Sequence, residues 1–249
     1  MGKAEDYRAV LRLSTDWLAY LLQESGLPGP RGNLELIQAV ADEGSEQLFL
    51  DYISYSPLEA PTNNPKEFLV CCGVVGLGRL AAEGDLQWME TLRRMASDPR
   101  WRTREAVAMA LQRLGKANMP VLLREMAVWS RGNLLEQRAA AAALCEPVLL
   151  KKPSEVGLVL KILDDITASL PEQKDRKSDE FQALRKGLAY CWSVAVAALP
   201  AIGKPLMEKW LASPDRDIRW IMKENLKKNR LVRVDPNWVA ERLMQLETS

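Results

Sequence analysis

The sequence predicts an all-α protein: a right-handed α-α superhelix, or solenoid, of about five helix pairs in one domain over residues 1–249. Three observations support this prediction. Apolar residues recur at helical spacing in successive segments that Pro, Gly, Asn and Ser separate. No segment alternates apolar and polar residues as a half-buried strand does. Several residues recur at an offset of 34, and helix pairs repeating at about this period bury their faces by stacking.

Residues 1–56 are expected to cap the array with short helices. Ala4–Glu24 has the apolar spacing of one amphipathic helix, which the sequence GLPGPRG at Gly26–Gly32 must end. Asn33 and Ser45 have the side chains preferred at helix N-caps. The helices expected here are Ala4–Glu24, one capped by Asn33 through Ala41, and one capped by Ser45 through about Ser54.

The rest of the chain is expected to alternate helices with short polar connections. Pro65 suits the entry to the helix that follows the loop Ser56–Pro65. Gly187–Gly203 carries no charge, but it is shorter than a membrane span and contains Pro200, so we interpret it as a buried helix. The expected helices are Lys66–Ala82, Gly84–Ser97, Trp101–Leu114, Met119–Trp129, Leu134–Cys145, Ser154–Leu170 (capped by Ser154), Asp179–Leu199, Lys204–Leu211, Ile218–Asn229 and Pro236–Gln245.

The stretch Ala96–Lys116 is the clearest repeat unit. Its Leu-Gln-Arg-Leu at 111–114 follows Leu-Gly-Arg-Leu at 77–80 by 34 residues. Arg104 recurs as Arg138 at the same offset, and Arg185 recurs as Arg219. The alanines of 139–143 favour a helix and permit close approach of its neighbours.

Asp98 precedes Arg104 by six residues, a spacing that resembles the turn aspartate and second-helix arginine of HEAT repeats. The resemblance is strongest over Gly84–Leu114 and Lys204–Arg230. The Trp-x-x-Leu-Gly-x-x-Tyr pattern of tetratricopeptide repeats is absent. The resemblance implies an armadillo-type solenoid in which four residues are structural: Asp98, Arg104, Arg138 and Arg219.

Composition limits the chemistry that the chain can carry. The absence of histidine excludes Ser-His-Asp and Cys-His catalysis and any zinc site that needs imidazole. The four cysteines lie in apolar helical stretches and form no C-x-x-C pair, so we interpret them as buried thiols in a reducing compartment. The charged N-terminal residues lack a signal-peptide core. We therefore expect a cytoplasmic protein with no metal, cofactor or membrane partner.

Charge is unevenly distributed although the net charge is only +1. Arg93–Lys116 and Arg216–Arg233 each hold seven basic residues and two acidic ones, whereas Glu35–Glu67 holds seven acidic residues and one lysine. The basic runs could contact a polyanion; the alternative, which we favour, is solvated helix faces with salt bridges between repeats. The candidate partner- or nucleic-acid-binding residues are Arg100, Trp101, Arg102, Arg216, Trp220, Lys223 and Lys227.

Three functions remain open from the sequence. The first is a non-enzymatic scaffold that binds a protein partner on a concave face. The second follows from a distant resemblance to the HEAT-like DNA alkylation-repair glycosylases, whose concave face combines aromatic, basic and aspartate residues. Asp164 and Asp165 would be the carboxylates to consider, with surface and cap roles as the favoured alternative. The third is a HEAT-like chromophore lyase, which the missing histidine disfavours.

Overall fold

The computed structural model describes residues 2–248, and every regular element among them is helical. These residues form fifteen α-helices and two short 3₁₀ helices, with no strand. The all-α prediction is therefore confirmed. The chain divides into two compact units, unit 1 (Met1–Ala117) and unit 2 (Asn118–Ser249). The single array over 1–249 stays a prediction.

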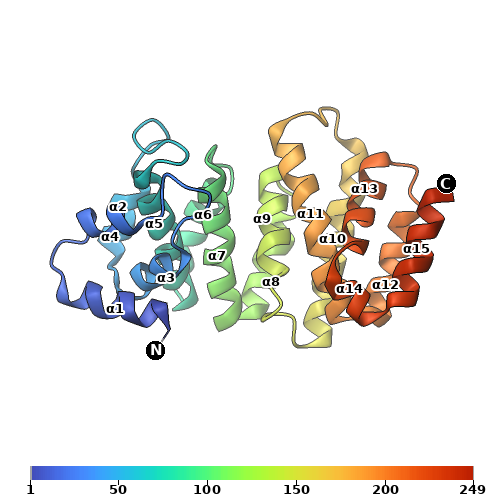
Figure 1. Ribbon diagram of the computed structural model, residues 1–249, viewed down its shortest axis with the longest axis horizontal. Helices are drawn as coiled ribbons and strands as arrows, with labels where there is room; N and C mark the ends of the chain where they lie inside the picture. The colour runs from blue at the N-terminus through green and yellow to red at the C-terminus, as the bar shows by residue number, and fades with distance from the viewer. Residues whose placement is uncertain (1, 249) are drawn as a thin grey trace. The chain divides into compact units, whose positions relative to one another are not determined.

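Unit 1 is built around α5, the long apolar helix Pro65–Ala82. Helices α2, α3, α4 and α7 pack against it, and Leu69, Val74 and Leu77 on it are fully buried. A helix that is apolar on nearly all sides needs such neighbours. The other helices of the unit are α1 (Lys3–Leu13), α2 (Leu18–Glu24), α3 (Leu34–Glu43), α4 (Glu46–Ile53), the 3₁₀ helix η1 (Leu86–Trp88), α6 (Met89–Met95) and α7 (Trp101–Ala117) (Figure 1).

Helices α5 and α7 approach closely at Gly78 and Ala110. A Cβ added at Gly78 would lie 2.4 Å from the Cα of Ala110, so no side chain fits between these backbones. Leu77 on α5 and Leu111 on α7, 34 residues apart, are both fully buried. The two leucines therefore occupy similar environments in neighbouring helices of unit 1.

Unit 2 contains two rows of helices. Helix α11 packs between α9 and α13 in one row, and α10 packs between α8 and α12 in the other. Ala139, Ala140 and Ala141 of α9 are buried, as expected for close helix approach. The bounds are α8 (Met119–Trp129), α9 (Leu134–Leu144), α10 (Pro153–Ser169), the 3₁₀ helix η2 (Leu170–Glu172), α11 (Asp179–Ala198), α12 (Pro200–Leu211) and α13 (Arg216–Leu226) (Figure 1).

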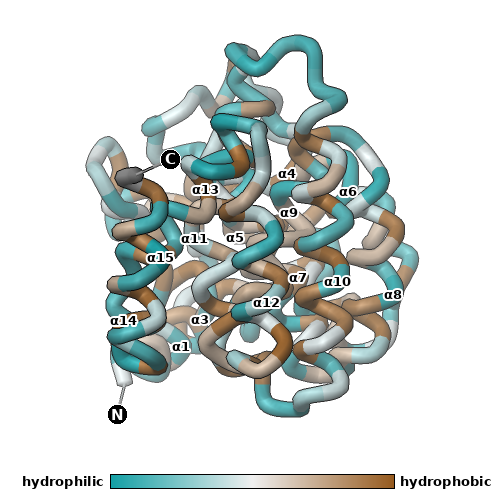
Figure 2. The backbone as a smooth tube through the Cα atoms, turned by 90° about the vertical axis from the view of Figure 1, so that its right-hand side faces the viewer, coloured by the Kyte–Doolittle hydropathy of each residue, from teal (hydrophilic) through white to brown (hydrophobic). Residues whose placement is uncertain are grey.

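Two further helices end unit 2. The six-residue α14 (Asn229–Val234) packs against α11 and buries Leu231, and α15 (Pro236–Thr248) buries Trp238 and Val239. Hydrophilic and hydrophobic residues interchange along α15, as in an amphipathic helix (Figure 2). Within residues 2–248, no helix combines the length and the apolar character that crossing a bilayer requires.

The prediction of one helix over Ala4–Glu24 is wrong, because the chain breaks between Leu13 and Leu18. The Ser14 hydroxyl donates to the carbonyl of Asp16 at 2.8 Å, and the Asp16 carboxylate accepts from the Leu18 N–H at 2.9 Å. Short polar side chains of this kind compete for backbone groups that a helix would otherwise pair. The apolar spacing continued across the break and concealed it.

Other boundaries also differ from the predicted ones. The segment Gly84–Ser97 contains a 3₁₀ turn before α6. Helix α10 begins at Pro153, with Lys152 and not Ser154 at its N-cap. Helix α12 begins at Pro200, because proline is tolerated in a first helical turn. The predicted helix Ile218–Asn229 is replaced by α13 and α14, which join at Lys227 and Lys228.

Several local signals are confirmed. The Asn33 and Ser45 side chains accept hydrogen bonds from N–H groups in the first turns of α3 and α4. Pro65 lies in the first turn of α5 behind an Asn64 cap. The uncharged stretch from Gly187 forms the second half of α11, where Trp192, Val194 and Val196 are buried. This part of Gly187–Gly203 is a buried helix, as predicted, but the prediction is wrong for the rest, because α11 ends at Ala198 and Pro200–Gly203 begin α12, where Ile202 is 49% exposed.

Candidate functional site

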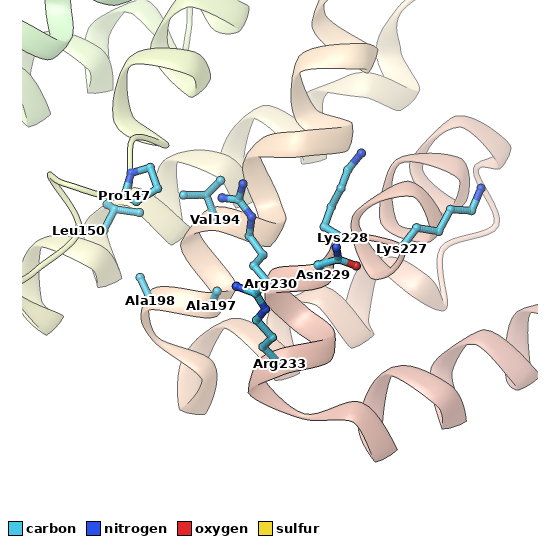
Figure 3. Close-up of a pocket in the computed structure, with 10 residues that line it drawn as sticks. All are labelled: Pro147, Leu150, Val194, Ala197, Ala198, Lys227, Lys228, Asn229, Arg230 and Arg233. Atoms are coloured by element: carbon cyan, nitrogen blue, oxygen red, sulfur yellow. The ribbon is translucent and has the colours of Figure 1, made fainter.

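A basic pocket of about 760 Å³ in unit 2 is the candidate site. It lies where α9 and α11 end and where α14 begins, so three segments distant in sequence form its wall. Ten residues line this basic pocket: Pro147, Leu150, Val194, Ala197, Ala198, Lys227, Lys228, Asn229, Arg230 and Arg233. Figure 3 shows Arg230 and Arg233 extending from α14 toward Val194 and Ala197 of α11.

Four of the ten lining residues are cationic and none is acidic. Lys227 also contacts the carboxylate of Glu224, one turn before it on α13. In Figure 3 its side chain points away from the two arginines. The cationic side chains closest to the apolar wall are thus Arg230 and Arg233.

Arg230 is held in place by an aromatic neighbour on α11. Its guanidinium lies 4.6 Å from the centre of the Tyr190 ring, and its Nη2 donates to the Tyr190 hydroxyl at 2.6 Å. Tyr190 is 45% exposed, so the pair lies at the surface. A guanidinium has five N–H donors, which leaves Arg230 able to bind a second acceptor while it stays ordered.

The remaining wall is small and aliphatic. Val194 and Ala197 belong to the apolar second half of α11, and Pro147 and Leu150 follow α9. Pro147 and Ala198 are exposed, whereas Val194 and Leu150 are buried, at 3% and 7% exposed. The pocket therefore offers apolar surface of limited area beside two guanidinium groups.

The positions of the cations partly follow from helix electrostatics. Lys227 is the C-cap residue of α13, and α9 and α11 end at Leu144 and Ala198 nearby. Each helix C-terminus carries about −0.5 elementary charge and favours cations. Three such ends do not offset four cationic side chains, so the basic pocket retains positive charge that can attract an anion.

In the first basic run, Arg93–Lys116, Arg100 forms hydrogen bonds and a salt bridge inside unit 1. Arg100, 3% exposed, donates to the Asp98 carboxylate at 2.7 and 2.8 Å and to the Tyr55 and Ala60 carbonyls at 3.2 Å. Burial lowers the pKa of Arg100, but the hydrogen bonds and charge of Asp98 outweigh it and raise that pKa overall. Arg100 is therefore placed as a structural residue in unit 1, not as an exposed binding residue.

Arg102 is likewise buried. It lies 3.5 Å from the Glu67 carboxylate, which is 0% exposed, and its Nη2 donates to the Gly29 carbonyl at 2.6 Å. Its guanidinium also lies 4.3 Å from the ring centre of Trp101. Of the three candidates at 100–102, only Trp101 is exposed, at 45%.

Arg104 contacts the turn that the repeat comparison indicated, but through backbone groups. Its Nη1 donates to the carbonyls of Asp98 and Pro99 at 2.6 and 3.0 Å, while Arg100 binds the Asp98 carboxylate. Arg138 on α9 and Arg219 on α13 are half-buried. A Cβ added at Gly187 of α11 would lie 3.4 Å from the Cγ of Arg138, which places Arg138 between neighbouring helices.

The candidates of the second run lie on α13 and at its C-cap, Lys227, at spacings of four, three and four residues, hence on one helix face. Arg216 is exposed, and Lys223 is half-exposed. Trp220 is covered by Arg185, whose guanidinium lies 3.6 Å from the ring centre. Among these four candidates only Lys227 lines the basic pocket.

The carboxylates near Arg185, those of Asp215 and Asp217, form salt bridges within unit 2. Arg176 binds Asp215 at 2.6 Å and Asp217 at 2.9 Å, and Arg185 lies 2.9 Å from Asp217. Hydrogen bonds from Arg176, together with two backbone N–H groups, hold the pKa of Asp215 below its usual range despite partial burial. The network fixes the turn before α13 and keeps these acidic groups engaged.

Asp164 and Asp165 form salt bridges near the surface of unit 2. Asp164 accepts from the Trp210 indole N–H at 2.7 Å and from Lys209 at 2.9 Å, which joins α10 to α12. Asp165 pairs with Lys161 at 3.2 Å on the exposed face of α10. These contacts agree with the surface roles that the sequence analysis favoured.

All four cysteines are free and buried. Burial raises the pKa values of Cys71, Cys72 and Cys145, and a hydrogen bond with Cys191 raises that of Cys145 further. Among residues 2–248, no three His, Cys, Asp or Glu side chains are grouped so as to hold a metal ion.

A second, smaller pocket of about 230 Å³ lies in unit 1 between the chain near Tyr55 and the turn at Asp98. Its charged lining includes Asp98 and Arg100, which bind each other. Because Arg100 is already paired, this pocket has less positive charge available to an anion than the basic pocket of unit 2 has.

Sequence reasoning missed most of the basic pocket. It named Lys227 as a candidate but not Lys228, Arg230, Arg233 or the tyrosine that orders Arg230. The available signal was the segment NRLVRV, in which Arg230 and Arg233 are three residues apart and hence on one face of a short helix.

No protein-family model matches the chain, and no curated protein matches it. Among solved structures, the chain is similar to an engineered protein whose crystal structure was determined by a structural genomics consortium. The identity is 16%, the alignment covers 91% of this chain and 96% of that chain, and the TM-score is 0.39.

Proposed function

We propose that the chain is a non-enzymatic interaction module, a HEAT-like scaffold that binds a macromolecular partner through the basic pocket of unit 2. The observation that carries this proposal is the combination of four cationic residues, an aliphatic wall and no acidic residue in one pocket. Such mixed surfaces favour protein partners, whose interfaces combine apolar contact with charged rims. The Arg93–Lys116 run gives less support, since Arg100 and Arg102 are buried in ion pairs.

The test replaces three pocket cations and compares a matched control. The pocket variant carries Lys228→Ala, Arg230→Ala and Arg233→Ala. The control carries Lys174→Ala, Lys177→Ala and Lys186→Ala, three exposed lysines of unit 2 that do not line the pocket, so the net charge changes equally.

A photo-crosslinking amino acid at the exposed pocket residue Asn229 should capture a partner from cells at physiological salt. The purified partner should then bind the wild-type chain and the control at least ten times more tightly than the pocket variant. Equal binding by all three chains, or crosslinks that competitor wild-type chain does not reduce, would contradict the proposal.

Nucleic-acid binding is the second candidate, favoured by the exposed Tyr190 ring beside Arg230. Several phosphate contacts would make duplex binding strongly salt-dependent. We expect no duplex binding at about 0.15 M salt, because only part of the basic sequence faces solvent. Micromolar binding that Arg216→Ala, Lys223→Ala and Lys227→Ala together abolish would establish this candidate, and release of an alkylated base would add glycosylase activity.

A further inference from the structure

We infer that the occupant of the basic pocket is an acidic linear peptide segment in which an aliphatic side chain is flanked by carboxylates. This inference rests on the proposed function and names the class of partner. It follows from three properties of the pocket: its size, the arrangement of its guanidinium groups and the nature of its wall.

The size suits a short segment. A pocket of about 760 Å³ falls within the range of about 300–1,000 Å³ that is typical of ligand pockets. Pro147 and Ala198 are exposed at its wall, so a chain can cross the pocket without rearrangement of the helices. A linear segment can enter such a site, whereas a folded domain would contact only the rim.

The guanidinium groups favour carboxylates. Arg230 and Arg233 lie three residues apart on α14 and therefore share a face of that helix. Arginine binds a carboxylate through two parallel N–H···O bonds, which adds geometry to charge. Tyr190 already orders Arg230, so less side-chain entropy is lost when an anion binds there. Lys228 adds a third positive charge to the lining, although its side chain points away from the two guanidinium groups (Figure 3).

The wall selects a peptide over other anions. Pro147 and Ala198, which are exposed, and the half-buried Ala197 offer aliphatic contact that an inorganic anion would leave unused. No aromatic residue is among the ten described lining residues, so the pocket lacks a platform for a stacked base. The half-exposed ring of Tyr190 is not part of this lining and has the Arg230 guanidinium 4.6 Å from its centre. An aliphatic side chain between carboxylates uses both parts of the surface.

Fluorescence anisotropy with synthetic peptides and the full chain tests the inference. The probe is a labelled seven-residue peptide with a central leucine and three glutamates on each side of it, at about 0.15 M salt. Two matched peptides replace the six glutamates by glutamine or the leucine by glycine. A labelled single-stranded oligonucleotide of similar length is measured in parallel.

We expect the glutamine peptide to bind at least tenfold more weakly than the parent and the glycine peptide about fivefold more weakly. Arg230→Ala with Arg233→Ala should weaken the parent at least tenfold, whereas the triple lysine control should change it less than twofold. Arg233 is exposed and Arg230 is half-buried, so we expect the arginine variant to fold. Far-ultraviolet circular dichroism and thermal melts of each variant verify this.

Equal affinity for the glutamate and glutamine peptides, or no effect of the arginine variant, would overturn the inference. If the oligonucleotide bound more tightly than the glutamate peptide and the arginine variant lost that binding, the inference would also be overturned and the occupant would be a nucleic acid. If crosslinking at Asn229 still captures a partner that the pocket variant releases, the proposed function stands and only the class of occupant is wrong. If both experiments fail, the proposed function fails too.

Discussion

The two basic runs have equal numbers of cations and opposite surroundings. In Arg93–Lys116, Arg102 pairs with Glu67 and Arg113 pairs with Asp42, both from the acidic segment Glu35–Glu67 of unit 1. In Arg216–Arg233, by contrast, Lys227 pairs with Glu224 of the same run and Arg230 binds the Tyr190 hydroxyl. The comparison teaches that the number of cations in a basic stretch does not decide whether it forms a charged surface, because that depends on which carboxylates the packing brings to it.

The two carboxylates of the second run are both engaged, one by arginines outside the run and one by a lysine within it. Asp217 is bound by Arg176 and Arg185, which lie outside the run, and Glu224 is bound by Lys227. Lys228, Arg230 and Arg233 then line the basic pocket. The same composition therefore stabilises unit 1 and leaves positive charge at one place on unit 2.

The largest expected effect tests the internal use of the first run. Arg100→Met should lower the free energy of unfolding by about 3–5 kcal/mol, since it leaves the largely buried Asp98 carboxylate and two carbonyls without their donor. The exposed Arg233→Met should cost less than about 0.5 kcal/mol. Urea unfolding of both variants measures the difference, and similar losses would break the comparison.

A smaller effect concerns Asp215, the carboxylate directly before the second basic run. Asp215→Ala should cost about 1–2 kcal/mol at pH 7, because Asp215 caps α13 and binds Arg176. The folded-state pKa of Asp215 lies below its unfolded value, so this stability is complete above the unfolded pKa and disappears as pH falls through the folded one.

The difference between wild type and Asp215→Ala should therefore be constant from neutral pH to about pH 5 and shrink below about pH 4. Thermal melts across this range measure it. Asp165→Ala, which removes an exposed pair, should show less than about 0.5 kcal/mol at any of these pH values. A pH-independent gap for Asp215→Ala would mean that the ionised carboxylate is not what stabilises the turn.

One substitution near the basic pocket should strengthen peptide binding, and its effect is expected to be modest. Glu224→Gln removes the carboxylate that Lys227 contacts and should tighten binding of the acidic peptide about two- to threefold. Glu172→Gln changes net charge equally at an exposed site of unit 2 and should leave affinity unchanged. Anisotropy titrations measure both, and weaker binding by Glu224→Gln would contradict the electrostatic explanation.

The smallest effect is expected from the cysteines. Because all four thiols are buried, a thiol reagent should modify the native chain slowly and the unfolded chain quickly. Replacement of all four by alanine should leave peptide affinity unchanged and lower stability through packing alone. A rapidly reacting Cys145 or Cys191 in the native chain would support the chromophore-lyase alternative.

Much of the helical segmentation followed from local chemistry. The caps at Asn33 and Ser45, the proline entry to α5 and the buried alanines of α9 were all predictable, because helix formation depends on residues within four positions of each other. The break at Ser14–Trp17 escaped prediction because the apolar spacing continues across it.

Helix α14 could not be predicted with the same ease. Six residues form no stable helix in isolation, and α14 depends on burial of Leu231 against unit 2. The basic pocket depends on this helix, since α14 brings Arg230 and Arg233 to the end of α11. The site was therefore less accessible to sequence reasoning than the helices that surround it.

The sequence by itself determined an all-α chain with most of its helices and caps, because hydrogen bonds and apolar spacing within one or two turns decide those features. Only the tertiary structure decided which charges meet. Arg113 and Asp42 are 71 residues apart, and Tyr190 and Arg230 are 40 apart. The packing of whole helices brings such pairs together, and it determines whether an arginine binds a carboxylate of its own unit or faces a ligand.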